Sequence, residues 1–266
     1  MAKAIMIQGT ASGVGKTILT LALCRIFAQD GHKVAPFKAQ NMTTHTTITK
    51  NGDEIAVSGW LQAKAAGIEP CADVAPIVVK PPFEMPAKES RAIKIEKIMQ
   101  AYGTLNEQYD IIVIEGAGSP VELNLNSDDF ANMGLASRVD APVILVGDID
   151  RGGVFASLYG TLAIMSDDDR KRVKATIVNR FYGVSSDFAD GVAILEELTG
   201  IPVAGVVPYA KINLPEEDGL RNGAAFNKNA NYETQFDTIA AHVRKSFDME
   251  FIYKILEDGH ESCSFV

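Results

Sequence analysis

A glycine-rich segment near the start of the sequence carries the residue types of a phosphate-binding loop. Residues 9–17 read GTASGVGKT and end in the Gly-Lys-Thr of such loops. Glycines let backbone N–H groups turn toward phosphate, a lysine reaches the β and γ phosphates of a nucleoside triphosphate, and a threonine hydroxyl ligates Mg²⁺. The loop therefore predicts nucleotide and Mg²⁺ binding. The residues assigned to the nucleotide are Thr10, Ser12, Gly13, Val14, Gly15, Lys16 and Thr17, of which Lys16 is also predicted to be catalytic and Thr17 a metal ligand.

The sequence on either side of this loop supports the prediction. The apolar run at residues 4–7 predicts a strand before the loop, and the apolar spacing over residues 18–27 predicts a helix after it. Five residues separate Gly9 from Gly15, whereas the standard pattern has four. The alternative is a glycine-rich turn that only caps the helix, and the Gly-Lys-Thr ending makes this the weaker interpretation.

An acidic residue follows a second buried strand. The apolar run 111–114 leads directly into Glu115, and the small-residue turn 116–120 comes next. A phosphate-binding loop of this kind needs a carboxylate at the end of a neighbouring strand to hold the metal or its water, so Glu115 is a predicted Mg²⁺ ligand. An ordinary strand-end carboxylate is the alternative.

Further charged residues follow other predicted strands. Asp148 and Asp150 come after the run 143–146 and are candidate catalytic carboxylates, although Asp150 could instead cap the helix that begins near Gly153. Lys38 ends the second strand and is a candidate for binding a phosphoryl group or a carboxylate, with a solvated lysine as the alternative. Glu54 is a candidate for a further metal contact, with a solvated turn as the alternative.

The elements that must position these residues alternate along the chain. Short continuous apolar runs are separated by stretches long enough for a helix, which predicts an α/β fold of the P-loop NTPase type, with a doubly wound, mainly parallel sheet flanked by helices. We predict one such domain over residues 1–221 and a C-terminal helical extension over residues 222–266. The apolar runs lie at 4–7, 33–36, 111–114, 143–146, 175–178 and 203–207.

Composition narrows the classes of partner. The 266 residues include 25 Lys+Arg and 34 Asp+Glu, giving a net charge of −9, and 47% are hydrophobic. This is a globular composition with no polybasic run, which argues against nucleic-acid or membrane-surface binding. The sequence has no apolar stretch of membrane-spanning length, and its three cysteines form no metal or disulfide pattern, so we expect a cytoplasmic protein.

Eight sequence blocks together resemble the N-terminal ATPase half of cobyric acid synthase, a family that belongs with the dethiobiotin synthetase-like amidoligases. They occur in the family's order between Ala4 and about Asp218. The blocks are GTASGVGKT, PFKAQNM, IEGAGSPVELNL, FANMGLA, GDIDRGGVFASLYGT, VNRFYG, GVVPY and LPEED.

The resemblance implies an activity and residue roles. It implies ATP-dependent amidation of corrinoid side-chain carboxylates, in which ATP forms an acyl phosphate and ammonia displaces phosphate. Thr17, Glu115 and one of Asp53 or Glu54 would hold Mg²⁺, and Lys38 would face the transferred phosphoryl group. Asn179 and the loop at Pro208 would recognise adenine.

The resemblance also bears on partners. Family members usually carry a C-terminal glutamine amidotransferase domain with a cysteine in a Gly-x-Cys-x-Gly turn, and Cys24, Cys71 and Cys263 all lack that turn. Ammonia is therefore expected from a separate glutamine amidotransferase subunit or from solution, and a homodimer is expected.

Two other functions stay open. Val57 stands where the family pattern has an arginine on the substrate side, so the substrate is less firmly indicated than the nucleotide. The spacing of the glycine-rich loop also permits a dethiobiotin synthetase-like carboxylase. A ParA/MinD-like switch ATPase is disfavoured because such proteins have an early lysine in the loop where this chain has Ala11.

Overall fold

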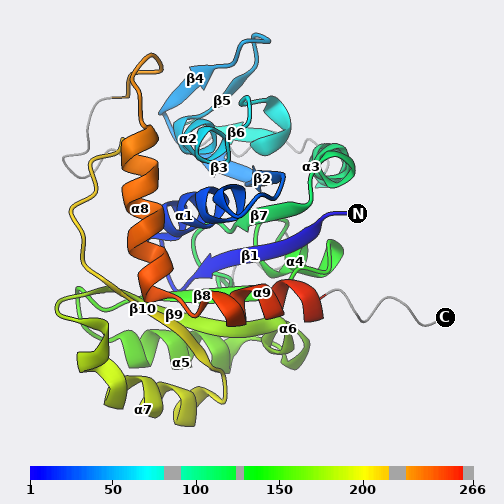
Figure 1. Ribbon diagram of the computed structural model, residues 1–266. Coiled ribbons are helices and arrows are strands. Elements are labelled where there is room, and N and C mark those ends of the chain that lie inside the picture. The colour runs from blue at the N-terminus through cyan, green and yellow to red at the C-terminus, as the bar shows by residue number, and fades with distance from the viewer. Residues whose placement is uncertain (81–90, 124–128, 216–225, 260–266) are drawn as a thin grey trace. The chain divides into compact units, whose positions relative to one another are not determined.

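The computed structural model describes residues 1–80, 91–123, 129–215 and 226–259 (Figure 1). The chain divides into two compact units, each made of several sequence segments. The first unit contains residues 1–2, 20–115 and 212–240, and the second contains residues 3–19, 116–211 and 241–266. The domain boundary predicted between residues 221 and 222 lies outside the described residues.

The second unit contains four neighbouring parallel strands of the main sheet. Their order is β10 (Val203–Pro208), β9 (Val173–Phe181), β8 (Val143–Asp148) and β1 (Lys3–Gly9). All three strand pairs are parallel, with Gly9 opposite Val146 and Asp148 opposite Asn179. The central positions of these strands are buried, which agrees with their continuous apolar sequences.

Helices flank this sheet. Among the described residues of the second unit, α5 (Val154–Ile164) packs against β8, α7 (Ala189–Thr199) against β10, and α9 (Met249–Asp258) against β1. The shorter helices α4 (Met133–Arg138), α6 (Asp167–Arg172) and η3 (Ser185–Phe188) complete the connections. Gly200 ends α7 with a φ of 68°, a left-handed conformation that glycine adopts without steric cost.

The strands of the first unit form short pairs. The strands β2 (Val34–Phe37) and β7 (Ile111–Glu115) pair in parallel, as do β3 (Gln40–Met42) and β6 (Ile77–Val79). A short antiparallel hairpin joins β4 (Thr46–Ile48) to β5 (Glu54–Ala56) and runs directly into α2 (Val57–Ala65). The remaining helices of this unit are η1 (Ala72–Val74) and α3 (Arg91–Gln108).

Two helices contribute residues to both units. They are α1 (Lys16–Gln29), which begins at the glycine-rich loop, and α8 (Glu233–Ser246), which buries Phe236, Ile239 and Val243 at helical spacing. The predicted fold class is confirmed, because buried parallel strands alternate with flanking helices. No helix of the described residues is long and apolar enough to cross a membrane.

Candidate nucleotide-binding site

The glycine-rich loop lies between β1 and α1, as its sequence predicted. Gly13 and Gly15 have φ angles of 75° and 104°, in the region that favours glycine. A Cβ atom on Gly15 would lie 2.2 Å from the Asn179 amide nitrogen, so a larger residue does not fit there. Ser12 and Gly13 are exposed, which leaves the rim of the loop accessible to a ligand.

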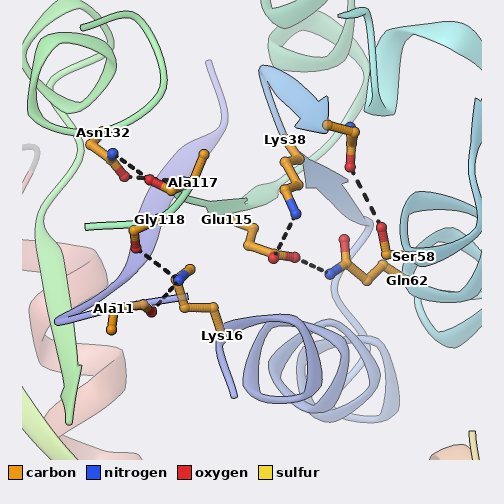
Figure 2. Close-up of polar contacts among 10 residues, drawn as sticks. Ala11, Lys16, Lys38, Ser58, Gln62, Glu115, Ala117, Gly118 and Asn132 are labelled. Atoms are coloured by element: carbon orange, nitrogen blue, oxygen red, sulfur yellow. Dashed lines mark hydrogen bonds and ion pairs between the residues drawn. The ribbon is translucent and has the colours of Figure 1, made fainter. Parts of the chain in front are cut away.

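The loop lysine is buried and oriented by backbone oxygens. Lys16 Nζ donates to the carbonyl oxygens of Ala11 and Gly118, each at 2.9 Å (Figure 2). Gly118 belongs to the segment of residues 116–119 that follows β7, which we call the post-β7 loop. A phosphate oxygen is a stronger acceptor for an ammonium group than a carbonyl, so this arrangement suits a lysine that receives an anion.

A side chain that the sequence did not single out holds the post-β7 loop. The buried Asn132 amide donates to the Ala117 carbonyl oxygen at 2.6 Å, and its Oδ1 accepts from the Ala117 N–H at 3.1 Å (Figure 2). The same amide donates to the Ser119 carbonyl oxygen at 3.3 Å. A Cβ atom on Gly116 would lie 2.4 Å from that Oδ1. The only sequence signal for Asn132 was its place in the FANMGLA block.

Asp129 fixes the backbone around Asn132. Its carboxylate accepts from the backbone N–H groups of Ala131, Asn132 and Gly134 at 3.0, 2.7 and 2.8 Å. A carboxylate that accepts several backbone N–H bonds orders the turn strongly. Asp129 and Asn132 together therefore set the position of the loop that contacts Lys16.

The first unit contains a buried charged cluster. Lys38 Nζ lies 3.0 Å from Glu115 Oε1, and Gln62 Nε2 donates to Glu115 Oε2 at 2.6 Å (Figure 2). Lys38 is 7% exposed and Glu115 only 1%. The alternative of a solvated lysine at this position is therefore wrong. Both carboxylate oxygens of Glu115 have a partner, so their orientation is fixed, and Gln62 is a second residue that the sequence did not reveal.

The charge of Glu115 affects the pKa of the neighbouring Cys24 thiol. Burial raises the pKa of Cys24, and the negative charge of Glu115 raises it further. Such a thiol stays protonated and serves as a small apolar residue in the core. Cys24 is thus an unreactive neighbour of the cluster.

The residues predicted to hold Mg²⁺ come from both units. Thr17 belongs to the second unit and Glu115 to the first. Glu54 has a side chain 40% exposed and lies 2.5 Å from both Lys80 Nζ and Thr46 Oγ1, and the Lys80 hydrogen bond lowers its pKa. No group of three or more His, Cys, Asp or Glu able to hold a metal occurs in the part of the chain described.

The chemistry of these residues is compatible with nucleotide-bound Mg²⁺. That ion prefers oxygen ligands and usually takes only one or two from the protein, with phosphates and water supplying the rest. Glu115, with its two oriented oxygens, is a donor of that kind. The assignment of Thr17, Glu115 and Glu54 to Mg²⁺ stays a prediction.

Asp148 and Asp150 shape the turn after β8. Asp148 Oδ2 lies 2.6 Å from Arg180 NH1, and its Oδ1 accepts from the Asp150 N–H at 2.9 Å. The helix α5 is capped by Gly153 with no side-chain hydrogen bond, so the alternative that Asp150 caps this helix is wrong. Their catalytic roles stay predictions.

The residues predicted to contact adenine lie at the ends of β9 and β10. Asn179 is buried, and its Nδ2 donates to the Val14 carbonyl of the glycine-rich loop at 2.8 Å. The Pro208 carbonyl lies 2.9 Å from His242 Nε2. Asn179 is thus in contact with the loop, and adenine recognition by Asn179 and Pro208 stays a prediction.

Comparison with known proteins assigns the family. The family model AAA_26, described as an AAA domain, matches residues 3–216. This chain belongs to that family. Every residue predicted to bind nucleotide or Mg²⁺ or to be catalytic, from Thr10 to Pro208, lies within the matched residues. The helices α8 and α9 follow them.

The AAA domain of this chain resembles curated cobyric acid synthases. The protein of Streptococcus sanguinis is 49% identical over 237 residues, covering 83% of this chain and 48% of that protein. The protein of Clostridium acetobutylicum is 45% identical over 272 residues, covering 96% and 55%. The chain thus spans about half the length of the curated relatives it matches, and the family resemblance predicted from the eight blocks is confirmed.

Solved structures give a weaker likeness. The signal recognition particle receptor FtsY from Elizabethkingia anophelis, solved in complex with GDP, is 20% identical with a TM-score of 0.49. That alignment covers 79% of this chain and 58% of the other.

Proposed function

We propose that this chain is an ATP-dependent amidoligase of the cobyric acid synthase type, which activates corrinoid side-chain carboxylates for amidation. The observation that carries the proposal is the buried Lys16, oriented by Ala11 and Gly118 at the start of α1. The identity of 49% to a cobyric acid synthase supports the choice of reaction. ATP is the expected nucleotide.

The reaction begins with attack of a substrate carboxylate oxygen on the γ phosphorus of ATP. The new P–O bond forms as the bond to the β,γ-bridging oxygen breaks, giving an acyl phosphate and ADP. Ammonia then adds to the carbonyl carbon, phosphate leaves, and the nitrogen loses a proton to give the amide. A carboxylate is already an adequate nucleophile, so the attack needs no general base.

The main barrier to the first step is repulsion between two anions. Lys16 and the backbone N–H groups of the loop bind the triphosphate and stabilise the charge that develops on the leaving ADP. Mg²⁺ bound by Thr17, Glu115 and Glu54 would neutralise further phosphate charge. Lys38, fixed by Glu115, is the second cation that we assign to the transferred phosphoryl group, and Asp148 and Asp150 are assigned to the acceptor side.

The proposed partners follow from the reaction. The acceptor is a small carboxylate, for which a corrinoid is expected, and the nitrogen donor is ammonia from solution or from a separate glutamine amidotransferase subunit. A homodimer is the proposed assembly. Neither nucleic acid nor a membrane has a part in this chemistry.

The test is acceptor-dependent turnover of Mg-ATP by the purified chain with ammonium chloride. The acceptors compared are cobyrinic acid a,c-diamide, diaminopelargonic acid with bicarbonate, and none. We expect ADP release that depends on the corrinoid, with a product mass that corresponds to conversion of acid to amide. Turnover only with diaminopelargonic acid and bicarbonate would favour a carboxylase instead. Nucleotide binding without turnover on any acceptor would contradict the amidoligase proposal and favour a switch ATPase.

A further inference from the structure

The loop that contacts Lys16 is held by a turn that lies far from the glycine-rich motif in the sequence. We call residues 129–134 the anchor turn. Asn132 of this turn is buried, and its side chain bonds both the N–H and the carbonyl of Ala117, at 3.1 and 2.6 Å (Figure 2). A side-chain amide that pairs with the donor and the acceptor of one residue fixes the orientation of that backbone segment. The anchor turn therefore sets the path of the post-β7 loop one residue before Gly118.

The post-β7 loop is packed closely where it begins. The Gly116 N–H donates to the Ile7 carbonyl of β1 at 2.9 Å, and a Cβ atom on Gly116 would lie 2.4 Å from Asn132 Oδ1. Gly118 has a φ of 59°, in the region that favours glycine. The two glycines thus let the loop contact both β1 and the anchor turn while the Gly118 carbonyl accepts from Lys16 at 2.9 Å.

The anchor turn is ordered by its own carboxylate. Asp129 accepts from the N–H groups of Ala131, Asn132 and Gly134, and such charge-assisted bonds are among the stronger hydrogen bonds of a protein. A Cβ atom on Gly134 would lie 2.0 Å from the Asp129 carbonyl oxygen, so the turn closes tightly on itself. Anchor turn, post-β7 loop and glycine-rich loop all belong to the second unit. The anchor turn can therefore support the post-β7 loop within one compact unit.

This support matters because of the shape of a lysine side chain. Its ammonium group sits on a flexible four-carbon stem, which loses rotamer entropy when a ligand holds it in one conformation. Lys16 Nζ already donates to the carbonyl oxygens of Ala11 and Gly118 (Figure 2). An ammonium group that is in place before a phosphate arrives binds it with a smaller loss of entropy. Of the two carbonyls, that of Gly118 is the one whose position depends on the anchor turn.

We propose that Asn132 is a positioning residue for the nucleotide. Through Ala117 and Gly118 it keeps the Lys16 ammonium where the β and γ phosphates bind. This inference rests on the proposed function, because it takes the glycine-rich loop to bind the triphosphate of ATP. Asn132 acts through the post-β7 loop and needs no contact of its own with the nucleotide.

The first test separates positioning from stabilisation of the fold. Asn132→Ala is expected to weaken Mg-ATP binding about tenfold in calorimetric titration, at a temperature where circular dichroism shows the variant to be folded. A residue that only stabilised the fold would change the fraction of chain that binds and leave the dissociation constant of that fraction unaltered. An unchanged dissociation constant would overturn the inference. So would tighter binding, because the Gly118 carbonyl would then compete with phosphate for Lys16.

A double-mutant cycle tests whether the effect passes through Lys16. In the Lys16→Met background no ammonium group is left to position, so adding Asn132→Ala is expected to change Mg-ATP binding by less than about twofold. Ligand-observed NMR titration measures the weak binding expected in this background. A tenfold loss in both backgrounds would overturn the inference, because Asn132 would then affect ATP by a route that does not involve Lys16.

A matched control removes a helix cap in the same unit. The Asp248 carboxylate accepts from the Phe251 N–H at 3.0 Å at the start of α9, so Asp248→Ala is expected to lower stability and to leave the dissociation constant of Mg-ATP unchanged. An equal loss of affinity in Asp248→Ala and Asn132→Ala would overturn the inference, because any loss of stability would then have the same effect.

A second variant covers the case in which Asn132→Ala does not fold. Asp129→Asn keeps Asn132 and removes only the charge that orders the anchor turn, and it is expected to weaken Mg-ATP binding about threefold. Unchanged affinity in a folded Asp129→Asn would overturn the inference. Failure of the wild-type chain to bind Mg-ATP would contradict the proposed function itself, whereas wild-type binding that Asn132→Ala leaves unaffected would overturn only the inference.

Discussion

The glycine-rich loop of the second unit and the buried charged cluster of the first unit each contain a buried lysine, and the two lysines donate to different kinds of acceptor. Lys16 donates to the carbonyl oxygens of Ala11 and Gly118. Lys38 pairs with the carboxylate of Glu115, which Gln62 also binds. Lys16 is therefore hydrogen-bonded to partial charges, whereas Lys38 meets a full opposite charge.

This difference separates two roles for a cation. Exchanging a carbonyl for a phosphate oxygen strengthens the hydrogen bond of an ammonium group, so Lys16 is suited to bind an incoming anion. Separating a buried ion pair leaves an uncompensated charge and costs several kcal/mol. Lys38 is thus expected to stay with Glu115 and to serve the transferred phosphoryl group as a cation of fixed position.

The largest effect is expected at Lys16. In Lys16→Met the ammonium group that would meet the β and γ phosphates is gone, and we expect ATP binding to fall by about a thousandfold or more. Calorimetric titration with Mg-ATP measures this loss. The control is Lys174→Met, an exposed lysine on β9, which should bind ATP as the wild type does. Retained affinity in Lys16→Met would refute the role assigned to the loop.

Breaking the buried ion pair of Lys38 and Glu115 is expected to lower mainly the stability of the fold. Lys38→Met leaves Glu115 charged and buried, and we expect the free energy of unfolding to fall by about 3 kcal/mol. The double variant Lys38→Met/Glu115→Gln removes both charges and should lose less than the sum of the single variants in urea unfolding. Lys64→Met, whose ammonium pairs with the half-exposed Glu69, is the control and should cost no more than about 1 kcal/mol. Additive losses would show that Lys38 and Glu115 do not stabilise one another.

Local patterns predicted much of what these experiments examine. The glycine-rich loop is a contiguous motif, and the apolar runs located β7, β8 and β10 to within a residue or two because strands covered on both faces are apolar throughout. The strands β4 and β5 have only three residues each and no such run, so the hairpin that they form was not foreseen.

Contacts between residues that lie far apart in the sequence could not be predicted. Glu115 was predicted from its position after a strand, but its partner Lys38 lies 77 residues away and Gln62 lies 53 away. The stacking of Tyr182 on Tyr209 depends on the register of β9 and β10, and the bond from Asn132 to Ala117 depends on the path of the chain between them. Periodicity and motif spacing contain no information on such pairs.

An intermediate effect is expected at Asn132, which holds the post-β7 loop and thereby the Gly118 carbonyl. Asn132→Ala removes the partner of two carbonyls and one N–H, and we expect it to lower the free energy of unfolding by about 2 kcal/mol. Asn132→Asp keeps the acceptor for Ala117 N–H but turns an oxygen toward two carbonyl oxygens, so it should be at least as destabilising. Urea unfolding measures both, with the exposed Asn229→Ala as control. A fully stable Asn132→Asp would mean that the Nδ2 donor contributes nothing.

The smallest effect is expected at an exposed ion pair. Its contribution to stability is the reference against which the buried pair of Lys38 and Glu115 is compared. Asp237, whose side chain is 52% exposed, binds Arg25 at 2.8 Å, and this hydrogen bond holds the Asp237 pKa below its ordinary value. A lowered carboxyl pKa in the folded state adds stability above the unfolded pKa of about 4, and that stability is lost as the pH falls through the folded value.

Solvent weakens this pair, so Asp237→Asn should cost only about 0.5 kcal/mol in urea unfolding at pH 7. The same difference should remain at pH 5 and shrink as the pH falls below about 4, where Asp237 is protonated first in the unfolded chain and, at lower pH, in the folded chain. Glu197→Gln, which removes an exposed carboxylate of α7, is the control and should show no such pH-dependent difference. A cost at Asp237 as large as that at Lys38 would mean that burial is not what distinguishes the two ion pairs, and the contrast between the lysine held by carbonyls and the lysine held by a carboxylate would lose its physical basis.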